Sequence, residues 1–134
     1  QDHDKQVKVI AGKFENAEGP VKGHNIEPVY FDIELNKKKE FNFNLQSTHN
    51  TFVYLVSGEI EIGSKKHNNI KDSTLILLTK GEDLKVKAKT KAKFLLISGK
   101  PINEKIARGG PFVMNTKAEI LQAIQDYHND TFVK

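Results

Sequence analysis

Hydrophobic and polar residues alternate along most of the first hundred positions of the chain. In the segment 27–35, hydrophobic side chains fill every second position from Val29 onward, and Tyr30, Asp32 and Glu34 fall between them. A period of two predicts a strand with one buried face. Turn residues separate the segments of this kind, and the predicted strands are 7–11, 27–35, 41–45, 51–62, 73–78, 84–88 and 93–98. Such an even series of short strands predicts an all-β sandwich, jelly roll or barrel.

A glycine interrupts the longest of these segments, 51–62. Gly58 lies between the hydrophobic run that begins at Phe52 and the alternating residues from Glu59 to Ile62. A glycine inside a strand pattern favours a bend or a bulge, as the corner of a barrel requires.

One helix is predicted near the end of the chain. Thr116 is followed three positions later by Glu119, which is the spacing of a capping box. The hydrophobic residues that then share one stripe at helical spacing are Ile120, Leu121, Ile124 and Tyr127. We expect the helix to run from about Thr116 to Asn129 and to pack one face against a surface. Residues 1–6 are polar and are expected to be a disordered linker remnant.

Composition narrows the class of protein. A chain of 134 residues has the length of one domain, so we expect a single domain over residues 1–134. The sequence has no cysteine, which excludes disulfides and thiolate sites, and a cytoplasmic location is expected. No hydrophobic run approaches the length of a membrane span. Arg108 is the only arginine among 21 basic residues, which argues against direct nucleic-acid binding through base contacts.

The segment 110–116, which reads Gly-Pro-Phe-Val-Met-Asn-Thr, closely resembles a signature near the C-terminus of pirins. Flanking residues agree in order, including the segments 9–12, 28–32, 50–59 and 99–104, and the resemblance covers about residues 8–132. Two residues depart from the family pattern, both in the loop before the signature: Lys105 stands where proline is usual, and Gly109 where an aromatic residue is common.

The resemblance implies a cupin, that is, a double-stranded β-helix or jelly-roll barrel, with one C-terminal α-helix. Pirins are bicupins whose N-terminal barrel holds a mononuclear iron, and this chain would be the second barrel only. The parent protein would be a redox-responsive regulator or a quercetin 2,3-dioxygenase-like enzyme.

The residues needed for a cupin metal site are missing from this sequence. Such a site takes a His-x-His pair, a glutamate and a distant histidine. His49 lies in the expected region, but Thr51 stands two positions later, and the second region, 73–89, contains no histidine. We therefore expect no metal, cofactor or catalytic residue in this chain, with the iron in the absent N-terminal domain. A site that uses His49 and His67 remains a fallback hypothesis.

A row of lysines alternates along the segment 85–93. It consists of Lys85, Lys87, Lys89, Lys91 and Lys93. It could bind phosphate groups, but no aromatic residue is interleaved with it, and lysines commonly serve to keep an exposed sheet surface soluble.

Two functions remain in competition. The first is a non-catalytic interaction domain whose partner is the N-terminal cupin of the parent, with self-association when that partner is missing. Its candidate interface residues are Phe112, Val113, Met114, Ile120, Leu121, Ile124 and Tyr127. The alternative is a stand-alone cupin that binds a small ligand or a metal as an enzyme. The residues that would line its barrel pocket are Phe52, Tyr54 and Phe94.

Overall fold

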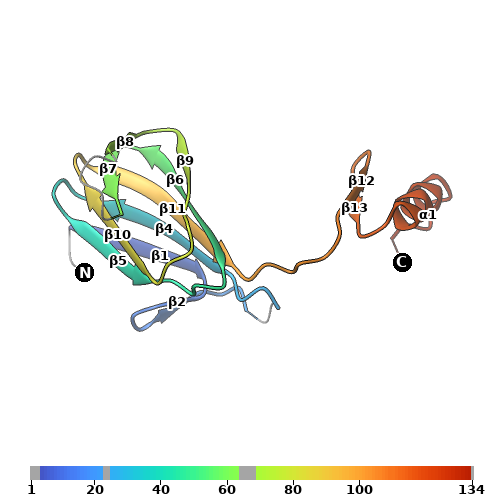
Figure 1. Ribbon diagram of the computed structural model, residues 1–134, viewed down its shortest axis with the longest axis horizontal. Helices are drawn as coiled ribbons and strands as arrows, with labels where there is room; N and C mark the ends of the chain where they lie inside the picture. Colours follow the sequence, from blue (N-terminus) through green and yellow to red (C-terminus); the bar gives the residue numbers. More distant parts are fainter. Residues whose placement is uncertain (1–3, 23–24, 64–68, 134) are drawn as a thin grey trace. The chain divides into compact units, whose positions relative to one another are not determined.

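The computed structural model describes residues 4–22, 25–63 and 69–133 (Figure 1). The chain divides into two compact units, Gln1–Pro101 and Ile102–Lys134, which we call the barrel unit and the C-terminal unit. The expectation of one domain over residues 1–134 stays a prediction. No helix in the described ranges is long and apolar enough to cross a membrane.

The barrel unit consists of two antiparallel sheets and a small hairpin. The five-stranded sheet has the order β1 (Lys5–Ala11), β4 (Val29–Leu35), β11 (Ala92–Gly99), β6 (Asn50–Ser57) and β9 (Thr74–Leu77). The four-stranded sheet has the order β5 (Glu40–Asn44), β10 (Asp83–Ala88), β7 (Glu59–Ile62) and β8 (Asn69–Lys71). The hairpin pairs β2 (Lys13–Phe14) with β3 (Ala17–Glu18). Most sheet neighbours are distant in sequence, as in a jelly roll.

Every segment predicted to be a strand contains one, so the predicted all-β architecture is confirmed. The segment 51–62 provides two, β6 and β7, which belong to different sheets. Gly58 joins them with a φ of 90°. A Cβ atom at this position would collide with the carbonyl oxygen of Lys91, so only glycine fits this corner.

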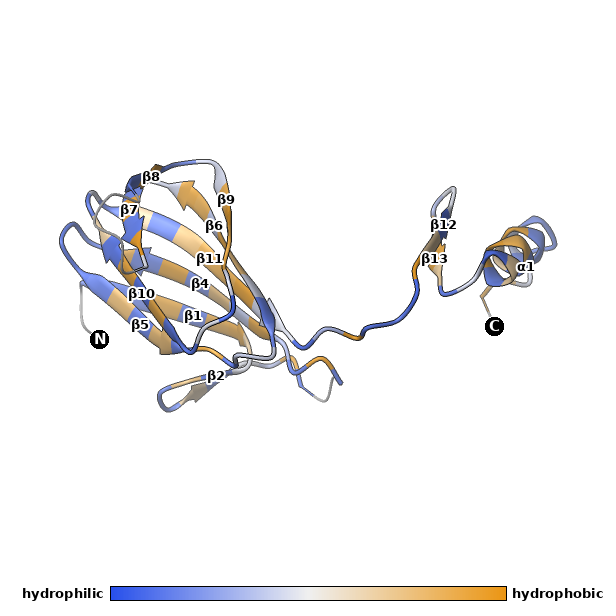
Figure 2. Ribbon diagram, in the orientation of Figure 1, coloured by the Kyte–Doolittle hydropathy of each residue, from blue (hydrophilic) through white to orange (hydrophobic). Residues whose placement is uncertain are grey.

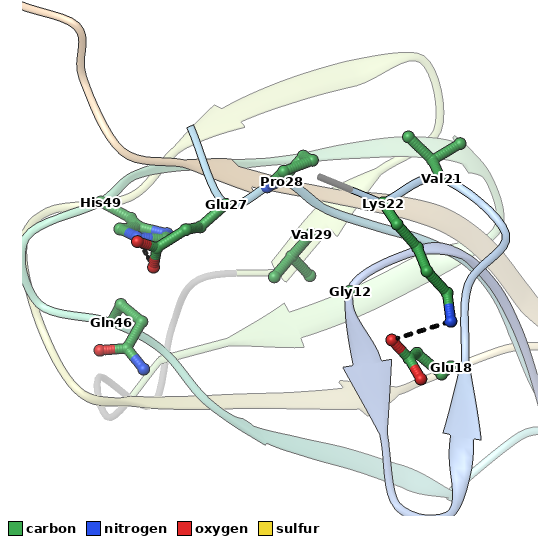
Figure 3. Close-up of a pocket in the computed structure, with 9 residues that line it drawn as sticks. All are labelled: Gly12, Glu18, Val21, Lys22, Glu27, Pro28, Val29, Gln46 and His49. Carbon is green, nitrogen blue, oxygen red and sulfur yellow. Dashed lines mark ion pairs between the residues drawn. The ribbon is translucent and has the colours of Figure 1, made fainter. Parts of the chain in front are cut away.

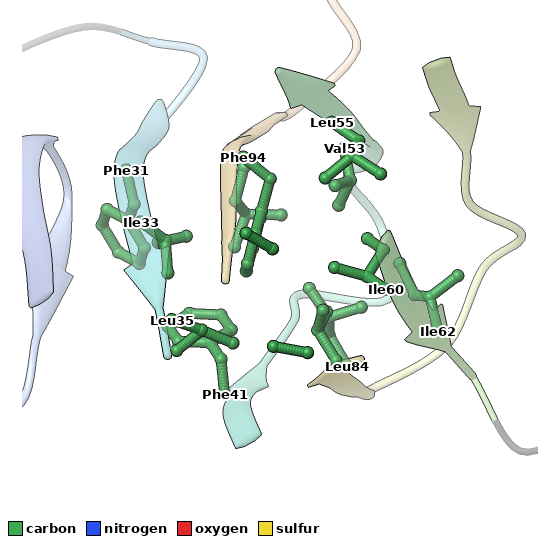
Figure 4. Close-up of a cluster of buried hydrophobic side chains, with 14 residues drawn as sticks. Phe31, Ile33, Leu35, Phe41, Val53, Leu55, Ile60, Ile62, Leu84 and Phe94 are labelled. Carbon is green, nitrogen blue, oxygen red and sulfur yellow. The ribbon is translucent and has the colours of Figure 1, made fainter. Parts of the chain in front are cut away.

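Side chains from both sheets fill the space between them (Figure 4). Phe41 on β5 and Phe94 on β11 meet across this space, with ring centroids 5.9 Å apart and an edge-to-face geometry. Both residues are fully buried. The buried core cluster comprises Phe31, Ile33, Leu35, Phe41, Val53, Leu55, Ile60, Ile62, Leu84, Val86, Ala88, Ala92, Phe94 and Leu96. The interior of the barrel is therefore a packed core.

The expectation of disorder over residues 1–6 is wrong for Lys5 and Gln6. Both residues belong to β1 and pair with Leu35 and Glu34 of β4. The backbone N–H of Asn36 also donates to the carbonyl of Asp4, at 2.9 Å. Backbone pairing at a sheet edge holds these residues, and their polar side chains do not reveal it.

The C-terminal unit is a hairpin followed by a helix. Strands β12 (Ala107–Gly109) and β13 (Phe112–Met114) pair with each other, and α1 runs over Lys117–His128. Thr116 is the N-cap of α1, and the reciprocal hydrogen bonds of the predicted capping box with Glu119 are both present. A Cβ atom at Gly109 would overlap Cγ2 of Ile120, so this glycine allows the helix to approach the hairpin closely.

Candidate functional site

His49 is the best candidate for a chemically active residue in the described part of the barrel unit. It lies in the connection between β5 and β6, where its backbone N–H donates to the carbonyl of Gln46 at 2.9 Å. This turn directs the imidazole into the protein, and the residue is only 6% exposed. A buried imidazole needs hydrogen-bond partners or a ligand to offset the loss of water.

A pocket of about 370 Å³ opens beside His49 at the end of the barrel where β4 and β6 begin (Figure 3). The residues that line it are Gly12, Glu18, Val21, Lys22, Glu27, Pro28, Val29, Gln46 and His49. Figure 3 shows His49 and Glu27 close to each other, and it shows the ion pair of Lys22 with Glu18, 3.3 Å apart, in another part of the pocket. The size suits a small polar molecule.

The imidazole of His49 approaches one acidic side chain among the residues that the structure describes, that of Glu27. Its Nε2 lies 3.8 Å from Oε2 of Glu27, which is beyond hydrogen-bond distance. The Glu27 side chain is 67% exposed, and its backbone has a φ of 47°, which is unusual for a residue with a side chain. Nδ1 of His49 is buried without a hydrogen-bond partner among the residues that the structure describes.

The arrangement does not fit a cupin metal site. Nowhere in the described ranges do three His, Asp or Glu side chains gather closely enough to hold a metal ion. His49 and Glu27 provide two groups only. His67, the other residue of the fallback hypothesis, lies outside the described residues.

The predicted barrel pocket of Phe52, Tyr54 and Phe94 is wrong. Phe94 is fully buried in the core between the sheets. On β6, however, Thr51, Val53 and Leu55 are the buried residues, and Phe52 and Tyr54 alternate with them. Phe52 and Tyr54 therefore point to the outer side of the five-stranded sheet.

The lysine row does not form one basic surface. Lys85 and Lys87 both pair with Glu40, at 3.1 and 3.2 Å. Their hydrogen bonds lower the pKa of the Glu40 carboxyl, and the bond from Lys85 has the largest effect. Lys93 lies on the five-stranded sheet. Its hydrogen bond to Asp32, and to a smaller extent its hydrogen bond to Glu34, raise the pKa of its ammonium group. Acidic partners thus offset much of the positive charge that a nucleic acid would require.

The candidate interface residues of the C-terminal unit differ in burial, and Met114 and Ile124 are half-buried. Phe112 and Ile120 help to hold the unit together: the Phe112 ring lies 6.0 Å from that of Tyr127, and Ile120 is buried against the hairpin. Val113 and Leu121 are exposed within the unit, as is Tyr127. That any of them contacts another domain stays a prediction.

Sequence reasoning missed the outer side of the five-stranded sheet. Strands β9 and β11 come from the segments Leu75-Ile76-Leu77-Leu78 and Phe94-Leu95-Leu96-Ile97, in which both alternating faces are hydrophobic. A continuous hydrophobic run is typical of a strand that is covered on both sides. This signal was available in the sequence.

Comparisons with known proteins agree at the levels of sequence and structure. The profile of the family described as "Pirin C-terminal cupin domain" matches residues 30–133. A pirin-like protein of Solanum lycopersicum is 42% identical over 101 residues, covering 74% of this chain and 35% of the relative. A pirin-like protein of Caulobacter vibrioides is 31% identical over 127 residues, covering 94% of this chain and 45% of the relative. The crystal structure of a quercetin 2,3-dioxygenase from Acinetobacter baumannii has a TM-score of 0.87 at 32% identity, covering 98% of this chain and 45% of that chain.

The fold is thus that of a cupin with one C-terminal helix. The chain belongs to the pirin family and corresponds to its C-terminal cupin domain, as the resemblance predicted. It spans less than half the length of each of these three relatives, and it aligns with their C-terminal half.

Proposed function

We propose that this chain is a non-catalytic interaction domain whose partner is the iron-binding N-terminal cupin of a pirin-like protein. The observation that carries the proposal is the filled interior of the barrel. In a cupin enzyme this space holds the metal and the substrate, whereas here side chains such as Phe41 and Phe94 occupy it. A barrel of this kind contributes shape and surface to a larger protein.

The parent protein is, in this proposal, a cytoplasmic redox-responsive regulator or a quercetin 2,3-dioxygenase-like enzyme. Its iron and its substrate site belong to the N-terminal domain, and this chain contributes no cofactor. The pairing of Lys85 and Lys87 with Glu40 supports a role without direct nucleic-acid contact.

Oxygen consumption tests the absence of catalysis. The chain is incubated with quercetin and ferrous iron, and we expect the rate of the free-iron control, because oxygen activation needs a metal held in an open coordination site. The Acinetobacter baumannii enzyme is the positive control. A rate above that of free iron would show that the chain is an enzyme in its own right.

The His49 pocket supports a second candidate function, the binding of a small polar ligand. Its buried imidazole and its volume of about 370 Å³ are the observations in favour. A ligand that engages His49 would stabilise the folded chain by mass action. Thermal-shift screening of small polar metabolites against the unmodified chain and the His49→Leu variant is the test, and only a shift that the variant abolishes supports this function.

A further inference from the structure

The pocket beside His49 presents two polar groups side by side within the barrel unit. The imidazole comes from the connection between β5 and β6. Figure 2 shows hydrophilic to neutral colouring on this connection, in contrast to the hydrophobic colouring of β6 that follows it. The second group is the carboxylate of Glu27, whose Oε2 lies 3.8 Å from Nε2 of His49. Two groups at this separation are too far apart to bond to each other, but one ligand can bond to both.

The burial of His49 determines which ring nitrogen is available to a ligand. Nδ1 is enclosed by protein and has no hydrogen-bond partner among the described residues. Nε2 is the nitrogen that approaches Glu27, on the side of the pocket. An enclosed N–H without an acceptor is rarer in proteins than an enclosed acceptor without a donor, and the carboxylate of Glu27 attracts a proton to Nε2. The neutral imidazole therefore carries its proton on Nε2 and offers an N–H donor to the pocket.

The carboxylate of Glu27 favours a positively charged ligand group. In the described part of the chain the group that it approaches is the His49 imidazole, and no lysine or arginine there pairs with it. The other acid of the pocket, Glu18, already pairs with Lys22 at 3.3 Å, in another part of the pocket (Figure 3). A charge-assisted hydrogen bond is about twice as strong as a neutral one. An ammonium group thus suits the acceptor side of the pocket best.

Hydrophobic side chains line another part of the pocket. They belong to Val21, Pro28 and Val29, and the volume of about 370 Å³ leaves room for a short aliphatic group beside them. Small-molecule sites commonly combine apolar walls with a few polar groups that fix the orientation of the ligand. This pocket therefore suits a molecule with charged groups at one end and a short aliphatic body at the other.

We propose that the pocket binds a free α-amino acid with an aliphatic side chain, which rests on the second candidate function, the binding of a small polar ligand. The ammonium group of the ligand donates to Glu27, and one of its carboxylate oxygens accepts from Nε2–H of His49. These two ligand atoms lie about 2.7 Å apart by standard bond lengths and angles. Because the two protein atoms are 3.8 Å apart, two hydrogen bonds of ordinary length run nearly parallel.

Simpler ligands satisfy only one of the two groups. An amine without a carboxylate bonds to Glu27 but covers the N–H of His49 without providing an acceptor, which costs free energy. A carboxylate without an ammonium group accepts from His49 but brings a second negative charge close to Glu27. The pocket should therefore bind the zwitterion more tightly than either of its singly charged analogues.

Three compounds with the same aliphatic part test this proposal on the whole 134-residue chain. L-Leucine carries both charged groups, isopentylamine lacks the carboxylate, and 4-methylpentanoate lacks the ammonium group. Each compound is titrated into the ¹⁵N-labelled chain, and its dissociation constant is obtained from the amide chemical shifts. We expect L-leucine to shift the amides around Glu27 and His49 and to bind at least about tenfold more tightly than the other two, because each of them lacks one charge-assisted hydrogen bond.

Two variants connect the binding to the pocket, and a third is the matched control. Glu27→Gln and His49→Leu should each weaken the binding of L-leucine at least about tenfold. Glu15→Gln is the control, because the Glu15 side chain is 69% exposed against 67% for Glu27 and the two backbones have φ values of 51° and 47°. Glu15 lies between β2 and β3 and does not line this pocket. Its substitution should leave the dissociation constant unchanged.

Other outcomes overturn the proposal in distinguishable ways. If 4-methylpentanoate binds as tightly as L-leucine and His49→Leu abolishes both, the small-ligand function stands but the ligand is not an amino acid. If Glu15→Gln weakens L-leucine binding as much as Glu27→Gln does, the attraction is a general effect of charge and not of the pocket. If none of the three compounds shifts the pocket amides at millimolar concentration, the amino-acid proposal fails. The small-ligand function itself fails only if the thermal-shift screen also finds no compound that requires His49.

Discussion

The hydroxyl oxygens of Thr51 and Ser98 lie 2.8 Å apart where β6 and β11 pair next to the His49 turn. The two residues face each other directly across the strands, and both are buried. Each hydroxyl is removed from water by burial, and the hydrogen bond between them offsets that loss. They are the polar end of a strand pair whose other inward residues are hydrophobic.

Thr51→Val should therefore destabilise the chain. The substitution keeps the shape of the side chain but leaves the Ser98 hydroxyl without this partner, and we expect the free energy of unfolding to fall by about 1–3 kcal/mol. Urea denaturation measures it. Combining Thr51→Val with Ser98→Ala removes both hydroxyls and should cost less than the sum of the single substitutions, whereas strictly additive effects would show that the two hydroxyls are not coupled.

Gly58 should tolerate no side chain. Gly58→Ala adds a Cβ atom that collides with the carbonyl of Lys91 at a φ of 90°, and we expect a loss of about 2–4 kcal/mol from strain and displaced backbone. Gly63→Ala is the matched control, because Gly63 has a φ of 79° but no atom of the residues that the structure describes lies within 4 Å of an added Cβ. It should cost only about 1 kcal/mol. Equal losses at the two positions, measured by thermal unfolding, would rule out the steric explanation.

The helix α1 should lose stability in acid through its capping box. Two hydrogen bonds from Thr116 lower the pKa of Glu119 below its ordinary value of 4.5. The bond from the Thr116 side chain has the larger effect, and the bond from its backbone N–H has the smaller one. A carboxylate with a lowered pKa contributes stability above its unfolded pKa and loses it as the pH falls through its folded pKa. Helical circular dichroism should therefore decrease when the pH is lowered from neutral to below 4.5.

Glu119→Gln provides the control for this pH dependence. Glutamine also serves in capping boxes but does not titrate. The variant should keep its helical signal over the part of the acid range in which Glu119 protonates. A decrease of the same size in both proteins would show that another group controls the helix.

The sequence predicted the strands of the sandwich well because each buries one face, and burial on one face leaves a period of two. It also predicted the capping box, which depends on two residues at a fixed spacing. Strands β2, β3, β8, β12 and β13 were missed, because strands of two or three residues are too short to show alternation. β8 pairs with β7, whereas β2 pairs with β3 and β12 pairs with β13.

The orientation of β6 could not be read from the sequence. One alternating set of this strand contains Thr51, Val53 and Leu55, and the other contains Phe52 and Tyr54, so both faces are hydrophobic. Periodicity identifies two faces but does not say which faces inward when both are apolar. The larger aromatic side chains favoured the wrong choice, and the same ambiguity concealed the hydrophobic outer side of the five-stranded sheet.

His49 should contribute little to the stability of the chain. Its Nδ1 is buried without a partner in the described structure, and the 3.8 Å approach of Nε2 to the largely exposed Glu27 is worth little. His49→Leu removes the unsatisfied nitrogen and keeps a buried side chain, so we expect an unfolding free energy that is unchanged or higher by up to about 1–3 kcal/mol. His49→Ala is the control for packing and should be destabilising by about 2–3 kcal/mol, because it leaves a cavity. If urea denaturation shows His49→Leu to be as harmful as His49→Ala, the imidazole makes a polar interaction that the free chain needs, and the view of His49 as a polar group poised for a ligand is contradicted.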